Sequence, residues 1–388
     1  MARLDLLLVA SAGMGERLLV SHFYAHPVGH AVEALHYAHG HWGSDTSREV
    51  SVLLNARTPV ELAGLCPWVT RAYAVDHPLL ERCADSPARL AHVPREWDWV
   101  LDDGRRYQDW QLELFPGLRE FSAASDEWFA CRIGRSVSGQ HRAGYAQAPW
   151  RFQIPRQAAD AATDTLNGTG PRIALMPAGS SGPEHYPSTA SWHLVLDGLL
   201  EAFGPDLQVV LIGKSSDEDG RTATAGAGRY MTLRDHPVTP MSAYDRPLVE
   251  QLALVEACDA FLSPHTGFGL AALACGTPWL TLSGGRWWEY FFNGVPFRSI
   301  LPDGAHASGS FAALEPEPLA ADGDAERSVS MTQARIRADV PRIVRAAQEL
   351  VNGTLSYERA IAEYYAELRT RVEPAAVWSI DNVHVAYL

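Results

Sequence analysis

The stretch that decides the fold reads Ser263-Pro264-His265-Thr266-Gly267-Phe268-Gly269-Leu270-Ala271-Ala272-Leu273-Ala274-Cys275-Gly276-Thr277-Pro278-Trp279-Leu280. It predicts a strand at 260–262, an Ala/Leu-rich helix from near Gly267 to Gly276, and a second strand at 278–282. Such a turn aims backbone N–H groups and the positive end of a helix at one point, which suits a phosphate or diphosphate. An ordinary βαβ unit with a glycine in its turn has the same pattern, so both interpretations stay open here.

Composition indicates an enzyme-sized globular protein. The chain has 388 residues, enough for about two domains, with 47% hydrophobic and 20% charged residues. A net charge of −14 argues against nucleic acid and anionic membranes as main partners. No window reaches the roughly 20 apolar residues of a membrane span, and we expect no signal peptide. The five cysteines form no CxxC pair, which favours a reducing cytoplasm.

The first part of the chain alternates apolar strands with helical segments, which predicts a parallel sheet. The predicted strands are 4–10, 51–55 and 72–75. The predicted helices are 18–39 and one that starts within 59–65. From about 95 to 153 the sequence is irregular and rich in tryptophan, and we expect insertions and helices facing a cleft there.

A second alternating series follows a linker, or a short helix and loop, at 157–170. Its further predicted strands are 172–176 and 208–212, and its further predicted helices are 191–203, 247–257, 334–352 and 356–371. The Ala-, Gly- and Pro-rich segment 303–327 predicts a mobile surface loop. We therefore expect an N-terminal domain over 1–165, a C-terminal domain over 166–355, and a helix and tail over 356–388 that pack back on the first domain.

One motif points weakly to another class of protein. Gly13-Met14-Gly15 is part of a dinucleotide-binding fingerprint, but its third glycine would fall at Leu18. An NAD-dependent enzyme is therefore a minor alternative.

The order of the motifs resembles the ADP-heptose-type bacterial glycosyltransferases of glycosyltransferase family nine. Leu7-Leu8-Val9-Ala10-Ser11-Ala12-Gly13-Met14-Gly15-Glu16-Arg17 looks like the strand and Gly-x-Gly-Asp loop of that family. Arg172-Ile173-Ala174-Leu175-Met176-Pro177-Ala178-Gly179-Ser180, followed by Tyr186-Pro187 and Trp192, looks like its Pro-Gly loop and Trp-Pro segment. His265-Thr266-Gly267 and the run from Leu270 to Pro278 look like its Asp-Thr-Gly signature. The resemblance implies the GT-B fold, two Rossmann-like domains with parallel sheets facing a central cleft.

The chain departs from the family pattern at three places. His265 stands where the family has Asp, Leu270 stands where it has His, and Ser188-Thr189-Ala190-Ser191 replaces the segment that carries its Lys. Those family residues contact the donor's diphosphate and sugar. The fold and nucleotide-sugar chemistry therefore carry over better than the identity of the donor, and ADP-heptose is not supported.

The donor requires groups that stabilise a leaving nucleoside diphosphate, which GT-B enzymes generally provide without a metal. The candidates are backbone, hydroxyl and basic groups at predicted strand ends: Gly179, Ser180, Ser181, Lys214, His265, Thr266, Gly267 and Arg286. For His265 the phosphate role is favoured over a turn histidine bonded to backbone, whereas Lys214 is equally interpretable as a solvated surface residue.

The acceptor hydroxyl requires a general base. Glu16 takes the place of the family's Asp after Gly-x-Gly, and it could equally be a residue that a helix dipole favours. His26 is the second candidate base. Gly13, Gly15, His22 and His30 are the candidates for acceptor binding. The spacing of four from His22 to His26 to His30 predicts one helix face, which would line the cleft rather than bind a metal.

The predicted function is transfer of a hexosyl- or heptosyl-type sugar from a nucleotide-sugar to an acceptor hydroxyl on a small molecule or glycan. We expect an inverting, metal-independent and cofactor-free reaction in the cytoplasm of a bacterium. A sugar-nucleotide epimerase of the same fold and a non-catalytic nucleotide-binding protein are the alternatives. The sequence assigns no donor, acceptor or oligomeric state.

Overall fold

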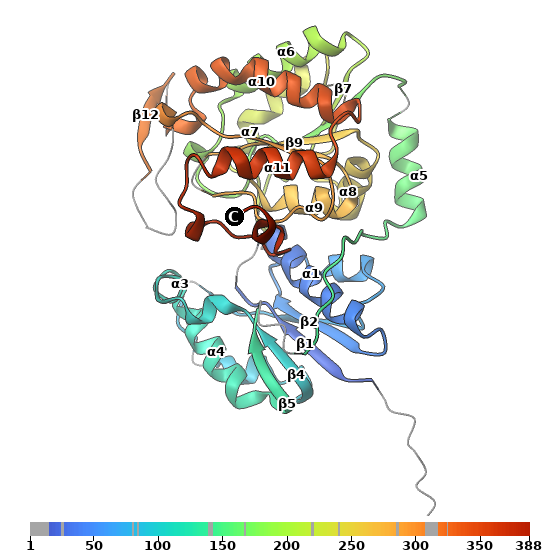
Figure 1. Ribbon diagram of the computed structural model, residues 1–388, viewed down its shortest axis with the longest axis vertical. Helices are drawn as coiled ribbons and strands as arrows, with labels where there is room; N and C mark the ends of the chain where they lie inside the picture. Colours follow the sequence, from blue (N-terminus) through green and yellow to red (C-terminus); the bar gives the residue numbers. More distant parts are fainter. Residues whose placement is uncertain are drawn as a thin grey trace, which may run out of the picture. The chain divides into compact units, whose positions relative to one another are not determined.

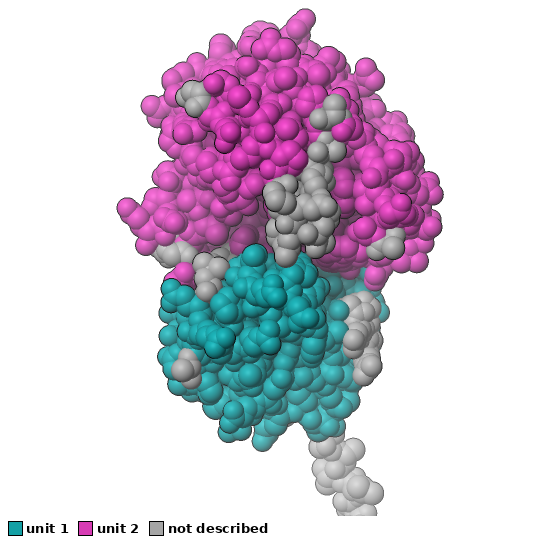
Figure 2. Space-filling view, turned by 90° about the vertical axis from the view of Figure 1, so that its left-hand side faces the viewer, with its two compact units in different colours: residues 1–24, 34–54, 68–147 teal, residues 25–33, 55–67, 148–388 magenta. Residues whose placement is uncertain are grey.

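The computed structural model describes residues 15–24, 27–79, 81–83, 85–138, 143–166, 168–218, 221–239, 241–284, 287–306, 317–323 and 325–388. The chain divides into two compact units, which Figure 2 colours separately. Unit 1 takes in Met1–Tyr24, Ala34–Leu54 and Trp68–Gln147. Unit 2 takes in Ala25–Glu33, Asn55–Pro67 and Ala148–Leu388. The predicted strand at 4–10 lies outside the described residues.

Unit 1 is built on a five-stranded sheet in the order β3-β2-β1-β4-β5 (Figure 1). Its strands are β1 (Arg17–Ser21), β2 (Glu49–Asn55), β3 (Arg71–Val75), β4 (Glu96–Asp102) and β5 (Ala130–Val137). Its helices are most of α1 (Val28–Ser44), α2 (Ser86–Arg89), α3 (Asp109–Leu114) and α4 (Pro116–Trp128). The pairings of β1 with β2, β1 with β4 and β4 with β5 are parallel, as the alternating pattern predicted.

The beginning of the predicted helix at 18–39 is wrong, because residues 17–21 form the central strand β1. Leu18, Leu19 and Val20 are fully buried. A central parallel strand is covered on both faces and reads as a continuous apolar run, which periodicity cannot tell from the start of a buried helix. The helix itself, α1, begins only at Val28, after Pro27.

The irregular region predicted at 95–153 contains two strands, β4 and β5. Polar residues interrupt both, and the register between them shifts between Trp97 and Trp99. This shift breaks the regular alternation by which a strand is recognised in a sequence.

Unit 2 is built on a six-stranded sheet in the order β11-β10-β9-β6-β7-β8, and the strand pairings within this sheet are parallel. Its strands are β6 (Arg172–Leu175), β7 (Gln208–Leu211), β8 (Met241–Ser242), β9 (Ala260–Pro264), β10 (Trp279–Leu282) and β11 (Phe297–Ile300). Its helices are α5 (Arg156–Thr165), α6 (Thr189–Phe203), α7 (Ala227–Tyr230), α8 (Leu248–Glu256), α9 (Gly267–Cys275), α10 (Gln333–Val351) and α11 (Tyr357–Leu368). Helices α6 and α10 pack together on one side of the sheet, and α8 and α9 pack together on the other (Figure 1).

The deciding stretch forms the predicted strand, helix and strand as β9, α9 and β10. Two glycines of this stretch are required for different physical reasons. A Cβ on Gly269 would lie 2.2 Å from the ring of Trp279, so only glycine lets α9 approach that buried indole. Gly276 ends the helix in the left-handed region, at φ 85°.

The segment predicted as a mobile loop at 303–327 contains part of an antiparallel strand pair, β12 (Leu319–Asp322) and β13 (Ala325–Ser328). The buried Arg327 ties this pair to the rest of unit 2, because its guanidinium donates to the carbonyls of Pro183 and Tyr186. Residues 307–316 and 324 lie outside the described ranges.

The predicted domain boundary at 165 differs from the division at 147/148. The C-terminal segment groups with unit 2, where Tyr364 Oη donates to the carbonyl of Glu289 and the amide of Ile380 donates to the carbonyl of Tyr290. None of the helices in the described ranges is long and apolar enough to cross a membrane.

Candidate functional site

Three loops of unit 2 meet at the carboxyl edge of its sheet. They follow β9, β6 and β7, which are neighbours in that order. Ligands of open parallel sheets bind at this edge, because helix N-termini and loop amides point outward there. The predicted donor residues in the described ranges all lie on these three loops.

The loop after β9 leads directly into α9. Thr266 caps the helix, since its hydroxyl oxygen accepts from the amide of Gly269 at 3.3 Å. Gly267 lies against the start of α1, because a Cβ built on it would be 2.6 Å from the amide nitrogen of Gly29. The N-terminal ends of α9 and α1 therefore touch backbone to backbone within unit 2, and two positive helix ends meet there.

We expect Gly267→Ala to disturb this contact. The added methyl would meet backbone atoms that cannot swing aside, and overpacking of this kind costs about 1–3 kcal/mol of the free energy of unfolding. Urea denaturation measures the loss. Gly228→Ala on α7 is the matched control, because a Cβ there meets no atom within 4 Å. Equal stability of the two variants would contradict the close contact.

The loop after β6 carries Gly179, Ser180 and Ser181. Gly179 lies between Tyr186 and Thr266, since a Cβ on it would be 2.7 Å from Tyr186 Oη and 3.2 Å from Thr266 Cγ2. The amide of Ser181 donates to Tyr186 Oη at 3.0 Å, and burial raises the pKa of that phenol. Ser180 and Ser181 are exposed, so their hydroxyls can reach a ligand.

A buried indole holds the same loop in place. Trp192 on α6 is fully buried, and its Nε1 donates to the carbonyl of Pro177 at 3.0 Å. This tryptophan, which carried part of the family resemblance, thus supports the loop rather than facing a ligand.

Lys214 lies in the loop after β7. Its ammonium group donates to the carbonyl of Ser216, and its backbone amide donates to the hydroxyl of Thr224 at 3.1 Å. Lys214 therefore lies near the sheet edge, as predicted, and its side chain is hydrogen-bonded within its own loop.

His265 forms a dyad with a buried carboxylate. Its Nδ1 is 3.2 Å from Oε1 of Glu289, whose side chain is completely buried. The Glu289 carboxylate also accepts from two hydroxyl groups, Thr281 Oγ1 at 3.3 Å and Ser299 Oγ at 2.7 Å. His265 Nδ1 and two hydroxyl groups therefore surround the same buried carboxylate.

A second dyad lies on the first turn of α1. His30 Nδ1 is 3.2 Å from Oε2 of Glu33, which is buried, and Tyr290 Oη donates to Oε1 of Glu33 at 2.8 Å. The ring of Tyr290 is also 6.1 Å from the ring of His265. Tyr290 therefore joins the two dyads into one network within unit 2.

Unit 1 carries a third histidine at its own sheet edge. His22 directly follows β1, is buried, and has its Nε2 2.6 Å from the hydroxyl of Ser138. Its Nδ1 is 3.9 Å from Oδ2 of Asp103, which Arg105 also contacts at 3.1 Å. The predicted face with His22, His26 and His30 on one helix is therefore wrong, because His22 follows a strand.

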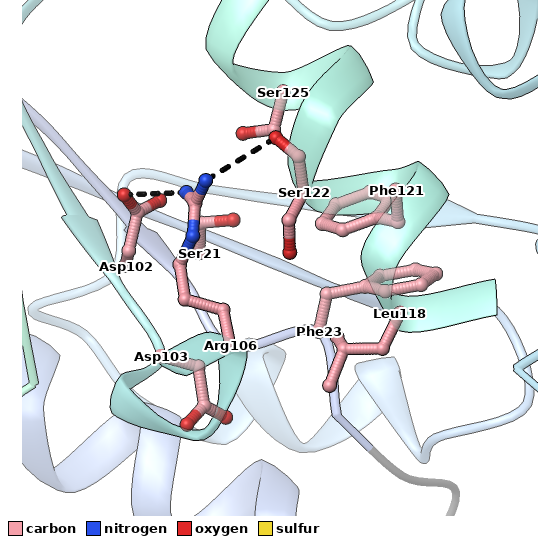
Figure 3. A pocket seen from close by; sticks show the side chains of 9 residues that line it. All are labelled: Ser21, Phe23, Asp102, Asp103, Arg106, Leu118, Phe121, Ser122 and Ser125. Carbon is pink, nitrogen blue, oxygen red and sulfur yellow. Dashed lines mark hydrogen bonds and ion pairs between the residues drawn. The ribbon is translucent and has the colours of Figure 1, made fainter. Parts of the chain in front are cut away.

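A small pocket opens beside this edge of unit 1, between the ends of β1 and β4 and helix α4 (Figure 3). One wall is apolar, with the rings of Phe23 and Phe121 stacked 3.7 Å apart. The other wall is an ion pair, in which Arg106 Nη1 donates to Asp102 Oδ2 at 2.8 Å. Burial raises the pKa of the Asp102 carboxyl.

The position predicted for Glu16 is wrong. Glu16 and Gly15 precede β1, so they lie at the amino end of that strand and not at the carboxyl end where ligands gather. The Glu16 carboxylate pairs with Arg48 at 3.1 Å. The loop that leaves the carboxyl end of β1 begins at His22.

Three further predicted residues, Gly13, His26 and Arg286, lie outside the described ranges. The residues that sequence reasoning missed are Glu33, Glu289 and Tyr290. The spacing of three between His30 and Glu33 on one helix could have indicated the first pair. No local pattern links His265 to Glu289. Within the described ranges, no group of three or more His, Cys, Asp or Glu residues is placed to hold a metal ion.

No protein-family model matches the sequence, and no curated protein is significantly similar to it. Solved structures are similar in fold. A family 9 glycosyl transferase from Veillonella parvula is 12% identical, with 87% of this chain and 98% of that one covered at a TM-score of 0.55. E. coli ADP-heptose lps heptosyltransferase II is 13% identical, with 85% and 98% covered at a TM-score of 0.50.

A third similar structure is the E. coli heptosyltransferase WaaC with ADP-2-deoxy-2-fluoro heptose, at 13% identity, 84% and 99% coverage and a TM-score of 0.50. These neighbours confirm the fold that the motif resemblance implied. The chain has the α/β fold of GT-B glycosyltransferases, with two parallel sheets, and its structure resembles those of glycosyltransferase family nine.

Proposed function

We propose that this protein is a glycosyltransferase that moves a sugar from a nucleoside-diphosphate donor to an acceptor hydroxyl. The observation that carries the proposal is the start of α9 at the sheet edge of unit 2, where a helix N-terminus, exposed serines and the His265–Glu289 dyad come together. The GT-B fold supports it, since GT-B glycosyltransferases share this architecture. A hexosyl or heptosyl donor and a cytoplasmic location belong to the proposal.

The leaving diphosphate gains negative charge as the bond between the anomeric carbon and the phosphate oxygen breaks. The amides at the start of α9 and the exposed loop of Ser180 and Ser181 would stabilise that charge. His265 would add a donor N–H, or a full positive charge when Glu289 balances a protonated ring. His265 would then take over part of the donor contact that an Asp or Lys makes in glycosyltransferase family nine.

His30 replaces Glu16 as the proposed general base. With its proton on Nδ1 facing Glu33, the neutral ring has its lone pair on Nε2. The acceptor oxygen forms its bond to the anomeric carbon, the phosphate oxygen leaves with the electron pair, and Nε2 takes the acceptor proton. A single displacement of this kind inverts the anomeric centre.

Thermal-shift measurements with ADP, GDP, UDP and dTDP test the proposal directly. We expect one nucleotide to raise the melting temperature, because a ligand that binds only the folded state stabilises it by mass action. No shift with any of the four would contradict the donor site. Release of free sugar without an acceptor would favour an epimerase, and binding without turnover would favour a non-catalytic protein.

Thr266→Val should weaken binding of the stabilising nucleotide by about 1–2 kcal/mol, the scale of a lost hydrogen bond to a charged group. It should also cost about 1 kcal/mol of stability, because the α9 cap is lost. Thr266→Ser keeps the hydroxyl and is the control. If calorimetry finds equal nucleotide affinity in the two variants, the phosphates do not bind at the start of α9.

We expect turnover to persist in excess EDTA, because the proposed stabilisation of the leaving group uses helix amides and histidine. The assay follows release of the nucleoside diphosphate with and without the chelator. Activity that disappears in EDTA and returns with Mg²⁺ or Mn²⁺ would contradict the metal-independent mechanism.

A further inference from the structure

Four rings form a row in unit 2: Trp287, His265, Tyr290 and Trp378. Consecutive ring centroids are 6.5, 6.1 and 4.9 Å apart. The two ends of the row are stacked pairs, with 16° between the rings of Trp287 and His265 and 24° between those of Tyr290 and Trp378. The row passes through His265, the residue before the α9 cap, and ends in the C-terminal segment.

Trp378 is the exposed end of this row. Half of its surface, 50%, is accessible to solvent, whereas its neighbours Val377 and Ile380 are 6% and 5% exposed. Those two apolar side chains anchor the segment, and the amide of Ile380 donates to the carbonyl of Tyr290 at 2.9 Å. Asp381 adds a contact to the amide of Phe292 at 3.0 Å. The indole is therefore held in place but is not needed as an anchor.

The order of the sheet separates this row from the other candidate donor loops. Strand β9 lies between β10 and β6. The loops with Gly179 and Lys214 follow β6 and β7 on one side, whereas Trp287 and Tyr290 follow β10 on the other. If the diphosphate lies at the start of α9 and the nucleoside lies over β6 and β7, the sugar lies on the side of β10, next to the aromatic row.

We propose that Trp378, stacked on Tyr290, is a platform for the face of a sugar ring. An aromatic face carries partial negative charge, and the C–H groups on one face of a pyranose ring are apolar and weakly positive, so the two surfaces pack well. The sugar belongs to the donor or to the acceptor, and the experiment below separates the two. This inference rests on the proposed function.

The test labels the full chain with 5-fluorotryptophan and follows its fluorine NMR spectrum. Trp378→Phe removes one resonance and so identifies the signal of Trp378. The probes are ADP, GDP, UDP and dTDP, then ADP-glucose, ADP-heptose, GDP-mannose, UDP-glucose and dTDP-glucose, then the methyl glycosides of glucose, galactose, mannose and N-acetylglucosamine.

A Trp378 signal that moves with a sugar nucleotide but not with its parent nucleotide supports a donor-sugar platform. A signal that moves with a methyl glycoside supports an acceptor platform. Equal movement with a nucleotide and its sugar conjugate would indicate stacking on the base and overturn the inference. A silent Trp378 signal beside other tryptophan signals that respond to nucleotide would also overturn it, while the proposed function stands. If no tryptophan signal responds to any nucleotide, both the platform and the proposed function are contradicted.

Calorimetry gives an independent measure with the sugar-bearing probe that binds. We expect Trp378→Ala to weaken its affinity by about fivefold to tenfold, the scale of one aromatic contact, and to leave the affinity for the bare nucleotide unchanged. Trp378→Tyr keeps a ring and should retain most of the affinity. An equal loss for the bare nucleotide would show a structural effect of the tail and overturn the platform.

Discussion

Replacing His30 by alanine is expected to lower turnover by about 10²–10⁴-fold, the contribution of a positioned general base. The affinity for the nucleoside diphosphate should stay the same, because the proposed phosphate contacts come from α9 and His265. Steady-state rates and calorimetry on the same purified variant measure the two quantities. His193→Ala on α6 is the control for removing an imidazole outside the two dyads, and its turnover should be normal.

The His30–Glu33 dyad leads to a second prediction for the same base. Glu33→Gln keeps the size of the side chain but removes the negative charge that favours the Nδ1 proton of His30. We expect a smaller loss of turnover than for His30→Ala and an altered dependence of kcat on pH, because the charge beside the base has changed. Near-normal turnover in His30→Ala would move the role to His22, which lies at the sheet edge of unit 1.

The elements that the sequence predicted well are those in which local pattern and tertiary environment agree. The helix at 267–276 has a cap, an apolar body and a terminal glycine, and it forms α9 at 267–275. The strands predicted at 51–55, 72–75, 172–176 and 208–212 are short apolar runs bounded by polar residues, and all are present. By contrast, the apolar run at 17–21 was predicted as the start of a helix and forms the strand β1, because a buried central strand and the start of a buried helix have the same apolar pattern.

The candidate site follows the same division. Helix ends and glycine turns are local features, so Thr266, Gly267 and Gly179 could be named from the sequence. The partners of the histidines depend on the fold, because Glu289 is 24 residues from His265 and Tyr290 is 257 residues from Glu33. The helix predicted from residue 18 also led to Glu16 as the base, and Glu16 lies at the amino end of β1.

The buried Arg335 holds elements of unit 2 together through contacts that no sequence motif predicts. Arg335 on α10 is 1% exposed. Its Nη2 donates to the carbonyl of Ile300 at 2.6 Å and to that of Ser283 at 3.4 Å, and its Nε is 2.8 Å from Asp339. Burial lowers the pKa of Arg335 to about 10. The guanidinium thus joins α10 to the carboxyl ends of β10 and β11.

Arg335→Met is expected to lower the free energy of unfolding by about 3–5 kcal/mol, as for other buried ion pairs that lose one partner. The methionine fills the space, so the loss comes from Asp339, which keeps only Arg342 as an ion-pair partner at 3.1 Å, and from two buried carbonyls that lose the guanidinium as a donor. Urea denaturation measures it. Arg337→Ala, two residues on and exposed, should change stability by less than about 0.5 kcal/mol.

The double variant Arg335→Met with Asp339→Leu separates the two costs. Removing both charges eliminates the carboxylate that has lost Arg335, but the carbonyls of Ile300 and Ser283 still lose the guanidinium as a donor, which costs about 1–3 kcal/mol. The double variant should therefore be more stable than Arg335→Met alone and less stable than the wild type. If it is no more stable than the single variant, the ion pair with Asp339 contributes little, and Arg335 acts chiefly as the hydrogen-bond donor that closes the ends of β10 and β11.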